Sequence, residues 1–134
     1  MVWPARRTRI LYSYSYSQCS QQRLLCASLN GKPVGILALK QASPSCMEVE
    51  VMGVISSLHR KGIGHQLLEM AKQVCQIEGI PFLQVKTVEA GHYPEYDLTN
   101  AFYQAEGFEP VEVFLGLWDP CNRCQQYILW LAKR

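Results

Sequence analysis

One amphipathic helix flanked by two strand-like runs constrains the fold of this chain more than any other feature. The segment after Gly64 carries apolar residues at helical spacing, and Gly79 and Pro81 then provide a stop. The apolar positions of the helix are Leu67, Leu68, Met70, Ala71, Val74 and Cys75. One strand is expected at 46–55 before the helix and another at 82–88 after it. This order predicts a right-handed βαβ unit with two parallel strands.

Other strand-like runs surround this unit. Asn30-Gly31 tolerates the positive φ of a tight hairpin turn, and Gly107 is a good left-handed helix cap. The further expected segments are a hairpin of strands 23–30 and 33–40, a loop at 90–98, a short helix at 99–106, and a closing hairpin of strands 108–117 and 126–131. The sequence therefore predicts an α+β fold, with a mixed and mostly antiparallel sheet around a parallel βαβ core.

The length predicts one domain spanning residues 1–134. A chain of 134 residues with 49% apolar residues can bury one core and has little left for a second. Residues 1–22 are atypical, because Tyr12, Tyr14 and Tyr16 alternate with serines, which suits either a first strand or a mobile end.

Charge and hydropathy exclude several function classes. The net charge of +2 is too small to predict a nucleic-acid partner, although Arg6, Arg7 and Arg9 make the N-terminus basic. No apolar run approaches the roughly 20 residues that span a bilayer, and the N-terminus lacks the apolar middle of a signal peptide. We expect a cytoplasmic protein with no membrane partner.

The cysteine pattern does not predict a metal or redox centre. Cys121 and Cys124 have the spacing of half a zinc site, but no second pair follows, and His92 is far away in sequence. The pair also lies in a turn rather than at a helix start, where the helix dipole would lower a thiol pKa. We expect reduced thiols and no bound metal.

A glycine-containing loop precedes the amphipathic helix. Its residues are His59, Arg60, Lys61, Gly62, Ile63 and Gly64. Two glycines let the backbone approach a ligand, unpaired helix N–H groups face outward, and two cations add positive charge, which together suit a pyrophosphate. A Walker loop would need Gly-Lys-Ser/Thr and a dinucleotide fingerprint a third glycine, so ATP and NAD are disfavoured.

Two segments of the chain resemble the GNAT acetyltransferases. The run from Val54 to Gly64 is similar to their Gln/Arg-x-x-Gly-x-Gly/Ala signature, with His59 where the family usually has Gln or Arg. Thr99-Asn100-Ala101-Phe102-Tyr103-Gln104-Ala105-Glu106-Gly107-Phe108 is similar to a Thr-Arg-Ala-Phe-Tyr-x-x-x-Gly-Phe segment of the superfamily. The resemblance covers residue 23 to the C-terminus. It implies a GNAT fold and acetyl transfer from acetyl-coenzyme A (acetyl-CoA) to a primary amine, by direct attack in a ternary complex.

The resemblance also implies roles for individual residues. The backbone of Val54 and Ile55 would hold the pantetheine, and an N–H there would polarise the carbonyl group. The predicted acetyl-CoA contacts are Val54, Ile55, His59, Arg60, Lys61, Gly62, Ile63, Gly64, His65 and Asn100. Tyr103 is the predicted general acid for the thiolate.

The general base has two main candidates. Glu48 and Glu50 point to one face of their strand, and either could take the proton of the incoming ammonium. His92 and His65 are weaker alternatives.

The acceptor and the assembly stay open at this point. Family members usually place one or two helices between the first two strands, and this chain has little room for them, so its acceptor side is open, truncated or completed by another subunit. A homodimer is one candidate assembly. A small amine, a peptide N-terminus and a lysine side chain are all candidate acceptors. The main alternative function is a non-catalytic coenzyme A binding or regulatory module; a structural interaction protein and a thiol enzyme rank below it.

Overall fold

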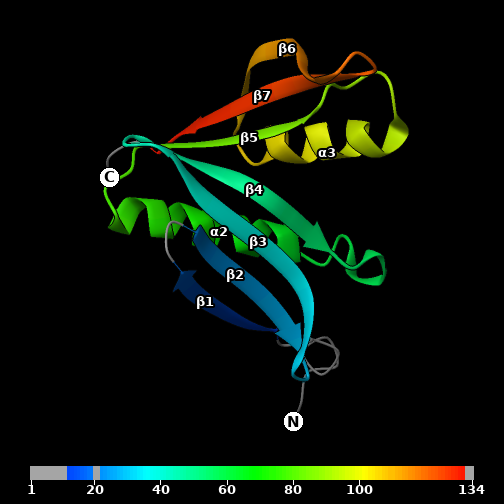
Figure 1. Ribbon diagram of the computed structural model, residues 1–134. Coiled ribbons are helices and arrows are strands. Elements are labelled where there is room, and N and C mark those ends of the chain that lie inside the picture. Colours follow the sequence, from blue (N-terminus) through cyan, green and yellow to red (C-terminus); the bar gives the residue numbers. More distant parts are fainter. Residues whose placement is uncertain (1–11, 20–21, 132–134) are drawn as a thin grey trace.

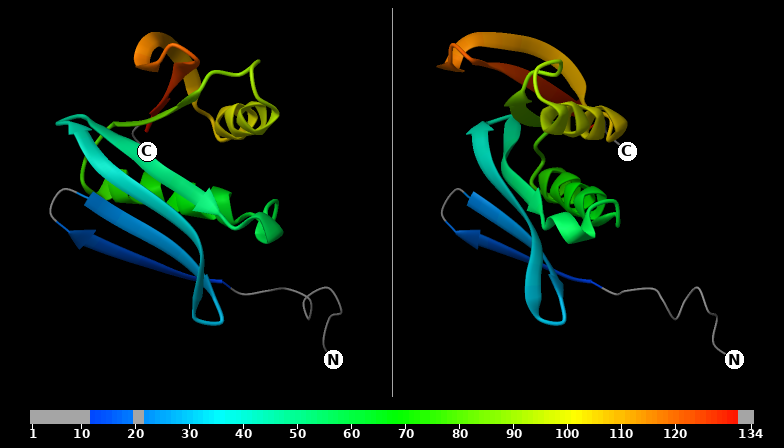
Figure 2. Two further views of the ribbon diagram at one scale, coloured as in Figure 1. Left: turned by 45° about the vertical axis from the view of Figure 1, so that its right-hand side comes forward. Right: turned by 90° about the vertical axis from the view of Figure 1, so that its right-hand side faces the viewer.

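The computed structural model places seven strands in one twisted sheet and two long helices on one face of that sheet (Figures 1 and 2). It describes residues 12–19 and 22–131. In chain order the elements are β1 (Ser13–Cys19), β2 (Gln22–Leu29), β3 (Lys32–Ser43), β4 (Cys46–Val54), a 3₁₀ turn η1 (Ser56–Leu58), α2 (Ile63–Ile77), β5 (Phe82–Val88), α3 (Pro94–Ala105), β6 (Glu109–Asp119) and β7 (Asn122–Trp130).

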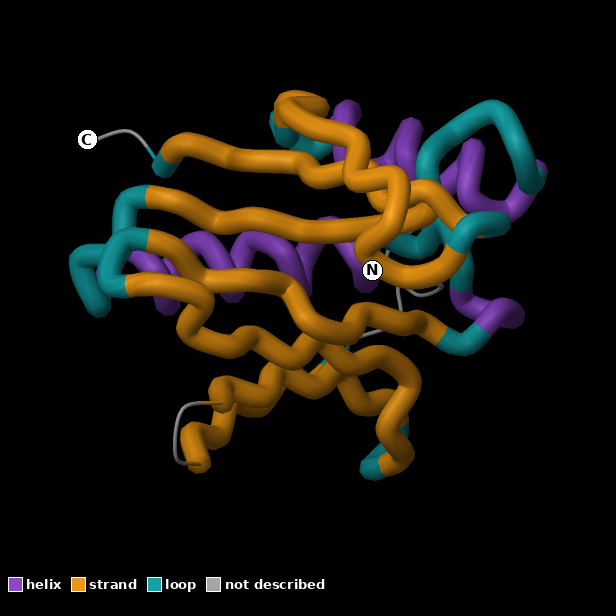
Figure 3. The backbone as a smooth tube through the Cα atoms, turned by 45° about the horizontal axis from the view of Figure 1, so that its top comes forward, coloured by secondary structure: helices purple, strands orange, loops and turns teal. Residues whose placement is uncertain are grey.

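The strand order is β1-β2-β3-β4-β5-β7-β6. Strands β4 and β5 are parallel and joined by α2, and every other neighbouring pair is antiparallel. Figure 3 shows the strands side by side, with the helices behind them. The predicted α+β fold and its parallel βαβ core are therefore confirmed.

The core lies between the sheet and α2. Leu25, Leu37 and Met47 are fully buried on the helix-facing side of β2, β3 and β4. The predicted apolar stripe of α2 packs onto them; its buried residues are Ile63, Leu67, Leu68, Ala71 and Cys75. Each buried leucine of this kind stabilises the fold by roughly 1.5–3 kcal/mol relative to an exposed one, so this layer dominates the stability of the N-terminal half.

The other face of the sheet has no helix over it in the part of the chain that the structure describes. Leu24, Ile36 and Val51 on neighbouring strands are 39%, 39% and 54% exposed. Their alternation with buried neighbours follows from the period of two in a strand.

Several element boundaries differ from the predictions. Helix α3 begins at Pro94 rather than at residue 99, so residues 94–98 are helical and not a loop. Proline is favoured at the first helical position, and Glu95 and Asp97 in the first turn complement the helix dipole. Strand β7 begins at Asn122 rather than at residue 126. Both elements were predicted too short, because turn-forming residues occupy the first turn of α3 and the first residues of β7.

The N-terminal segment is partly described. Of the two alternatives for this segment, a first strand or a mobile end, the structure shows the strand: residues 13–19 pair with β2. The basic residues Arg6, Arg7 and Arg9 lie outside the described residues. None of the helices in the described ranges is long and apolar enough to cross a membrane.

Candidate acetyl-CoA and acceptor site

The sheet is split between β4 and β5. These strands pair only from Cys46 with Phe82 to Val49 with Val85, and then diverge (Figure 1). Residues 51–54 of β4 pair with β3 on one side and have no strand partner on the other. Half of their backbone N–H and C=O groups therefore face the gap and are available to a ligand.

A β-bulge sits at the point where the split opens. Leu39 pairs with Val49 and Ala38 with Val51, so Glu50 is an extra residue on β4. Bulges of this kind bend the strand and re-aim its side chains beside functional sites. No sequence signal marked the bulge, because neither glycine nor proline occupies it.

The loop before α2 has the features of an anion site. Arg60 and Gly62 adopt positive φ angles of 64° and 84°, which turn the chain sharply into the helix. Gly62 is the N-cap, no side chain caps the helix, and its first turn carries no acidic residue. The exposed cations Arg60 and Lys61 precede it directly. The first helix N–H groups are therefore open to an anionic ligand, and these residues fit a pyrophosphate.

Two predicted contact residues have partners within the protein. His59 Nε2 lies 2.7 Å from the carbonyl oxygen of Val54, and the N–H of Ile55 donates to the carbonyl of Val34 at 3.0 Å. Both contacts hold the turn after β4 in place. Their structural role is to position the loop that Arg60 and Gly62 shape.

Gly64 is closely packed and does not face open space. A Cβ atom at this position would lie 2.9 Å from Cε of Met52 and 3.3 Å from Cζ of Phe102, whereas a Cβ on Gly62 would meet nothing within 4 Å. Gly64 therefore allows α2 to approach β4 and α3 closely. Of the two glycines that the sequence singled out, only Gly62 borders open space.

His65 points to α3. Its Nδ1 lies 2.9 Å and 3.0 Å from the two carboxylate oxygens of Glu106. Glu69 is near enough to make His65, Glu69 and Glu106 a geometrically feasible metal group. The Lys72 ammonium group already occupies this position as a counter-charge: its Nζ lies 2.8 Å from Glu69 and 3.9 Å from Glu106.

Tyr103 lies where α3 crosses toward the split. Its side chain is 5% exposed, and its hydroxyl donates to the sulfur of Met52 on β4 at 3.8 Å. Edge-to-face contacts with Phe102 and Phe108 hold the ring, with ring centroids 5.3 Å and 5.5 Å away. Burial raises the pKa of Tyr103 to about 12, so the phenol keeps its proton at neutral pH.

Asn100 is buried in a polar network that ties α3 to β5 and β7. Its side-chain N–H₂ donates to the carbonyl oxygens of Val88 at 2.9 Å and Tyr96 at 2.6 Å, and its side-chain oxygen accepts from the hydroxyl of Tyr127. Tyr127 was not identified from the sequence, because its partner lies in a distant helix. The network holds α3 against the sheet and so positions Tyr103.

The two glutamates lie on the open face of the sheet, each with two partners. Glu48 accepts from Gln84 at 2.8 Å and lies 3.5 Å from Lys86 Nζ. Glu50, in the bulge, accepts from Gln22 at 2.7 Å and lies 3.9 Å from Lys40 Nζ. The partners of Glu48 are on β5, so its carboxylate is held beside the split, whereas those of Glu50 are on β2 and β3, so its carboxylate leans away from the split. His92, in contrast, is exposed and lies 3.2 Å from Glu89, whose carboxylate also contacts Arg123 at 3.1 Å.

The cysteine pair of the last turn is divided between surface and interior. Cys121 is exposed and Cys124 is buried, and both are free thiols. Burial raises the pKa of the Cys124 thiol. Among the residues that the structure describes, no group of three possible metal ligands includes this pair.

Comparisons with known proteins agree with this geometry. The model of the acetyltransferase (GNAT) family matches residues 2–108, so the match begins earlier than residue 23 and ends at Phe108. Comparison with curated proteins gave no match.

Solved structures share the fold. A GNAT-family protein from Desulfovibrio desulfuricans superposes with a TM-score of 0.76 at 18% identity, over 84% of this chain and 70% of that one. The ribosomal-protein-S18-alanine N-acetyltransferase of Escherichia coli gives 0.72 at 16% identity, over 87% and 74%. A GNAT acetyltransferase of Elizabethkingia anophelis with acetyl-CoA bound gives 0.71 at 16% identity, over 82% and 76%. The chain therefore belongs to the GNAT family of acetyltransferases.

Proposed function

We propose that this protein transfers an acetyl group from acetyl-CoA to a primary amine, by direct attack of the amine in a ternary complex. The observation that carries the proposal is the split between β4 and β5, with an uncapped helix start at one end and Tyr103 beside it. The open sheet face, with Glu48 and Glu50 at the bulge, gives an amine access to the same gap. Family membership supports the reaction class.

Binding of the co-substrate would use groups that the fold leaves unpaired. The first N–H groups of α2, with Arg60 and Lys61, would hold the pyrophosphate. The free edge of residues 51–54 would hydrogen-bond the pantetheine amides, in the way that the edge of a sheet pairs with a further strand. When bound, acetyl-CoA supplies an activated acetyl thioester.

Tyr103 would act as the general acid. With a pKa of about 12, its phenol is a proton donor rather than a base at physiological pH. An ordinary thiol has a pKa near 8.5, so full proton transfer to a free thiolate is uphill by roughly 3.5 units, or about 5 kcal/mol. Tyr103 therefore contributes best through a hydrogen bond that strengthens as charge develops on the sulfur.

Glu48 or Glu50 would accept the proton of the incoming ammonium. Both lie on the open face: the Glu48 carboxylate accepts from Gln84 on β5, beside the split, and the Glu50 carboxylate accepts from Gln22 on β2. Glu48 is the more enclosed of the two, with a side chain 12% exposed against 35% for Glu50. Kinetics of Glu48→Gln and Glu50→Gln would separate them, because only loss of the base removes the acidic limb of the kcat/KM profile.

We place the reaction in the cytoplasm, since free cysteines are typical of a reducing compartment.

The acceptor could be a small amine, a peptide N-terminus or a lysine side chain. Solved relatives include an enzyme named for the alanine of a ribosomal protein and another named for aminoglycosides. A homodimer stays a prediction.

The first test is thermal unfolding with and without acetyl-CoA. At about 100 times the dissociation constant, linkage predicts roughly 2.7 kcal/mol of stabilisation and a Tm rise of several degrees. Lys61→Glu should remove most of that rise, whereas Lys32→Glu, which reverses the same charge at the exposed start of β3, should keep it. A folded sample with no shift would contradict the proposal.

The second test is turnover, measured as coenzyme A thiol released in the presence of amines. Tyr103→Phe should lower kcat about 100-fold while the affinity for acetyl-CoA stays the same. Binding of acetyl-CoA without turnover toward any amine would instead support the non-catalytic module, which the uncovered sheet face also permits.

A further inference from the structure

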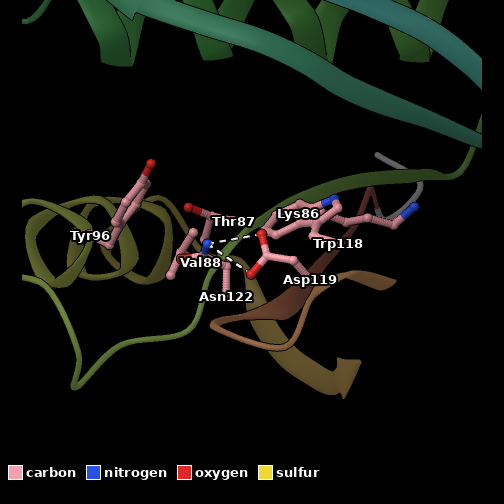
Figure 4. Close-up of a pocket in the computed structure, with 7 residues that line it drawn as sticks. All are labelled: Lys86, Thr87, Val88, Tyr96, Trp118, Asp119 and Asn122. Carbon is pink, nitrogen blue, oxygen red and sulfur yellow. Dashed lines mark hydrogen bonds between the residues drawn. The ribbon is translucent and has the colours of Figure 1, made fainter. Parts of the chain in front are cut away.

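A pocket lies at the C-terminal end of β5, beyond the point where β4 and β5 separate. Its volume is about 410 Å³, within the range of small-molecule sites. Figure 4 shows that its side chains come from three places: β5, the first turn of α3, and the adjoining ends of β6 and β7. The lining residues are Lys86, Thr87, Val88, Tyr96, Trp118, Asp119 and Asn122.

The pocket adjoins the proposed reaction centre through Lys86. This side chain lines the pocket, and its Nζ also lies 3.5 Å from Glu48. Lys86 follows the last residue of β5 that pairs with β4, so it sits at the mouth of the split. An acceptor could therefore place one group in the pocket and an amine beside Glu48.

The pocket carries an anion that is fixed in place. The Asp119 carboxylate accepts from the backbone N–H of Cys121 at 2.8 Å and from the side chain of Asn122 at 3.1 Å and 3.2 Å. These neutral donors lower the pKa of Asp119, so it is charged at physiological pH. Within the described part of the chain, no basic side chain forms an ion pair with it.

Two aromatic rings complete the cation-binding character of the pocket. Tyr96 and Trp118 border it from opposite sides in Figure 4, and an edge contact with Tyr93 at 6.0 Å supports the ring of Tyr96. The positive charges nearby already have partners: Lys86 is paired with Glu48, and Arg123, which follows Asn122, is paired with Glu89. A pocket lined by aromatic rings and one carboxylate favours the binding of an organic cation.

We propose that this pocket binds a second cationic nitrogen of the acceptor, so that the preferred substrate is a diamine or polyamine rather than a monoamine. The inference rests on the proposed acetyl transfer. One nitrogen would sit between Tyr96, Trp118 and Asp119 as an ammonium ion. The other would lose one proton to Glu48 and attack the thioester carbon, so that the amide bond forms as the carbon–sulfur bond breaks. The second proton of that nitrogen ends on the released coenzyme A thiol, and Tyr103 stabilises the developing thiolate through a hydrogen bond.

The test compares linear diamines with the monoamines of the same chain length, using full-length protein and acetyl-CoA. The wild type should have a higher kcat/KM for diamines, and Asp119→Asn should remove that preference by raising the diamine KM about fivefold, with the monoamine KM unchanged. The amide introduced by this substitution keeps an oxygen for the N–H of Cys121, so the turn is preserved. Glu112→Gln on β6 removes an exposed charge outside the pocket and should keep the preference.

Other outcomes separate the pocket from the reaction. Equal kcat/KM for both amine classes in the wild type, or an unchanged preference in Asp119→Asn, would overturn the pocket assignment and leave acetyl transfer standing. If no amine is acetylated, calorimetric titration of the diamine onto the protein decides the question. Binding that weakens in Asp119→Asn but not in Glu112→Gln would support the pocket, and no binding to the wild type would refute it.

Discussion

Replacing Tyr103 by Phe should change how stability depends on pH at alkaline values. Burial raises the pKa of this phenol to about 12 in the folded state, against about 10 in the unfolded chain. Above pH 10 the unfolded state therefore loses this proton first, and the free energy of unfolding falls as pH rises. The loss is about 1.4 kcal/mol at pH 11 and approaches roughly 2.7 kcal/mol above pH 12.

The variant has no such proton to lose. At neutral pH it forgoes only the weak hydrogen bond to Met52, at 3.8 Å, so the two proteins should differ by less than about 1 kcal/mol. The measurement is urea unfolding of both proteins at several pH values between neutral and about pH 11. The other titrating groups are the same in both proteins, so their contributions cancel in the difference between the two free energies of unfolding. Tyr93→Phe, at an exposed position, controls for loss of one tyrosine. Parallel curves for wild type and Tyr103→Phe would refute the burial argument.

Three further predictions concern packing, the buried network and the thiols. Gly64→Leu should destabilise the fold by about 1–3 kcal/mol through overpacking, whereas Gly116→Ala, which meets no atom within 4 Å, should be nearly neutral in urea unfolding. Gly64→Ala should cost less than about 1 kcal/mol, because the end of the Met52 side chain can move and alanine favours the helix. Asn100→Ala leaves buried polar groups unpaired and should cost roughly 2–4 kcal/mol, measured by thermal unfolding; a cost below about 1 kcal/mol would contradict the network. In thiol labelling of the native protein, exposed Cys121 should react first and Cys75, with a pKa of about 12, last; fast labelling of Cys75 would disprove its burial.

Local signals were sufficient to predict most of the fold. Asn30-Gly31 marks its hairpin because a tight turn needs residues that tolerate positive φ, and both have positive φ in the structure. The stripe that begins at Leu67 predicted α2 because helical spacing reports which face is buried. The start of α3 was missed because Pro94 is favoured both in turns and at the first position of a helix.

The site was predicted less completely, because much of it depends on contacts between distant segments. The loop around Gly62 could be identified from its own residues, and its helix start is uncapped as expected. The bulge at Glu50 depends on register with β3, and the hydrogen bond from Tyr127 to Asn100 joins segments from different parts of the chain. Asp119 falls in the turn predicted between the last two strands, and no local signal shows that α3 approaches it and Trp118.

The strand order has a consequence for how the chain assembles. Strands β1 to β4 form a meander in which each strand pairs with the next along the chain, so little loop-closure entropy opposes its formation. Strand β7 instead enters between β5 and β6 and pairs residues as distant in sequence as Phe82 and Trp130. We expect its insertion to be the late step of folding. Because β7 carries Tyr127, which locks α3, the proposed acid Tyr103 would reach its final position only after the loop at Gly62 is already formed.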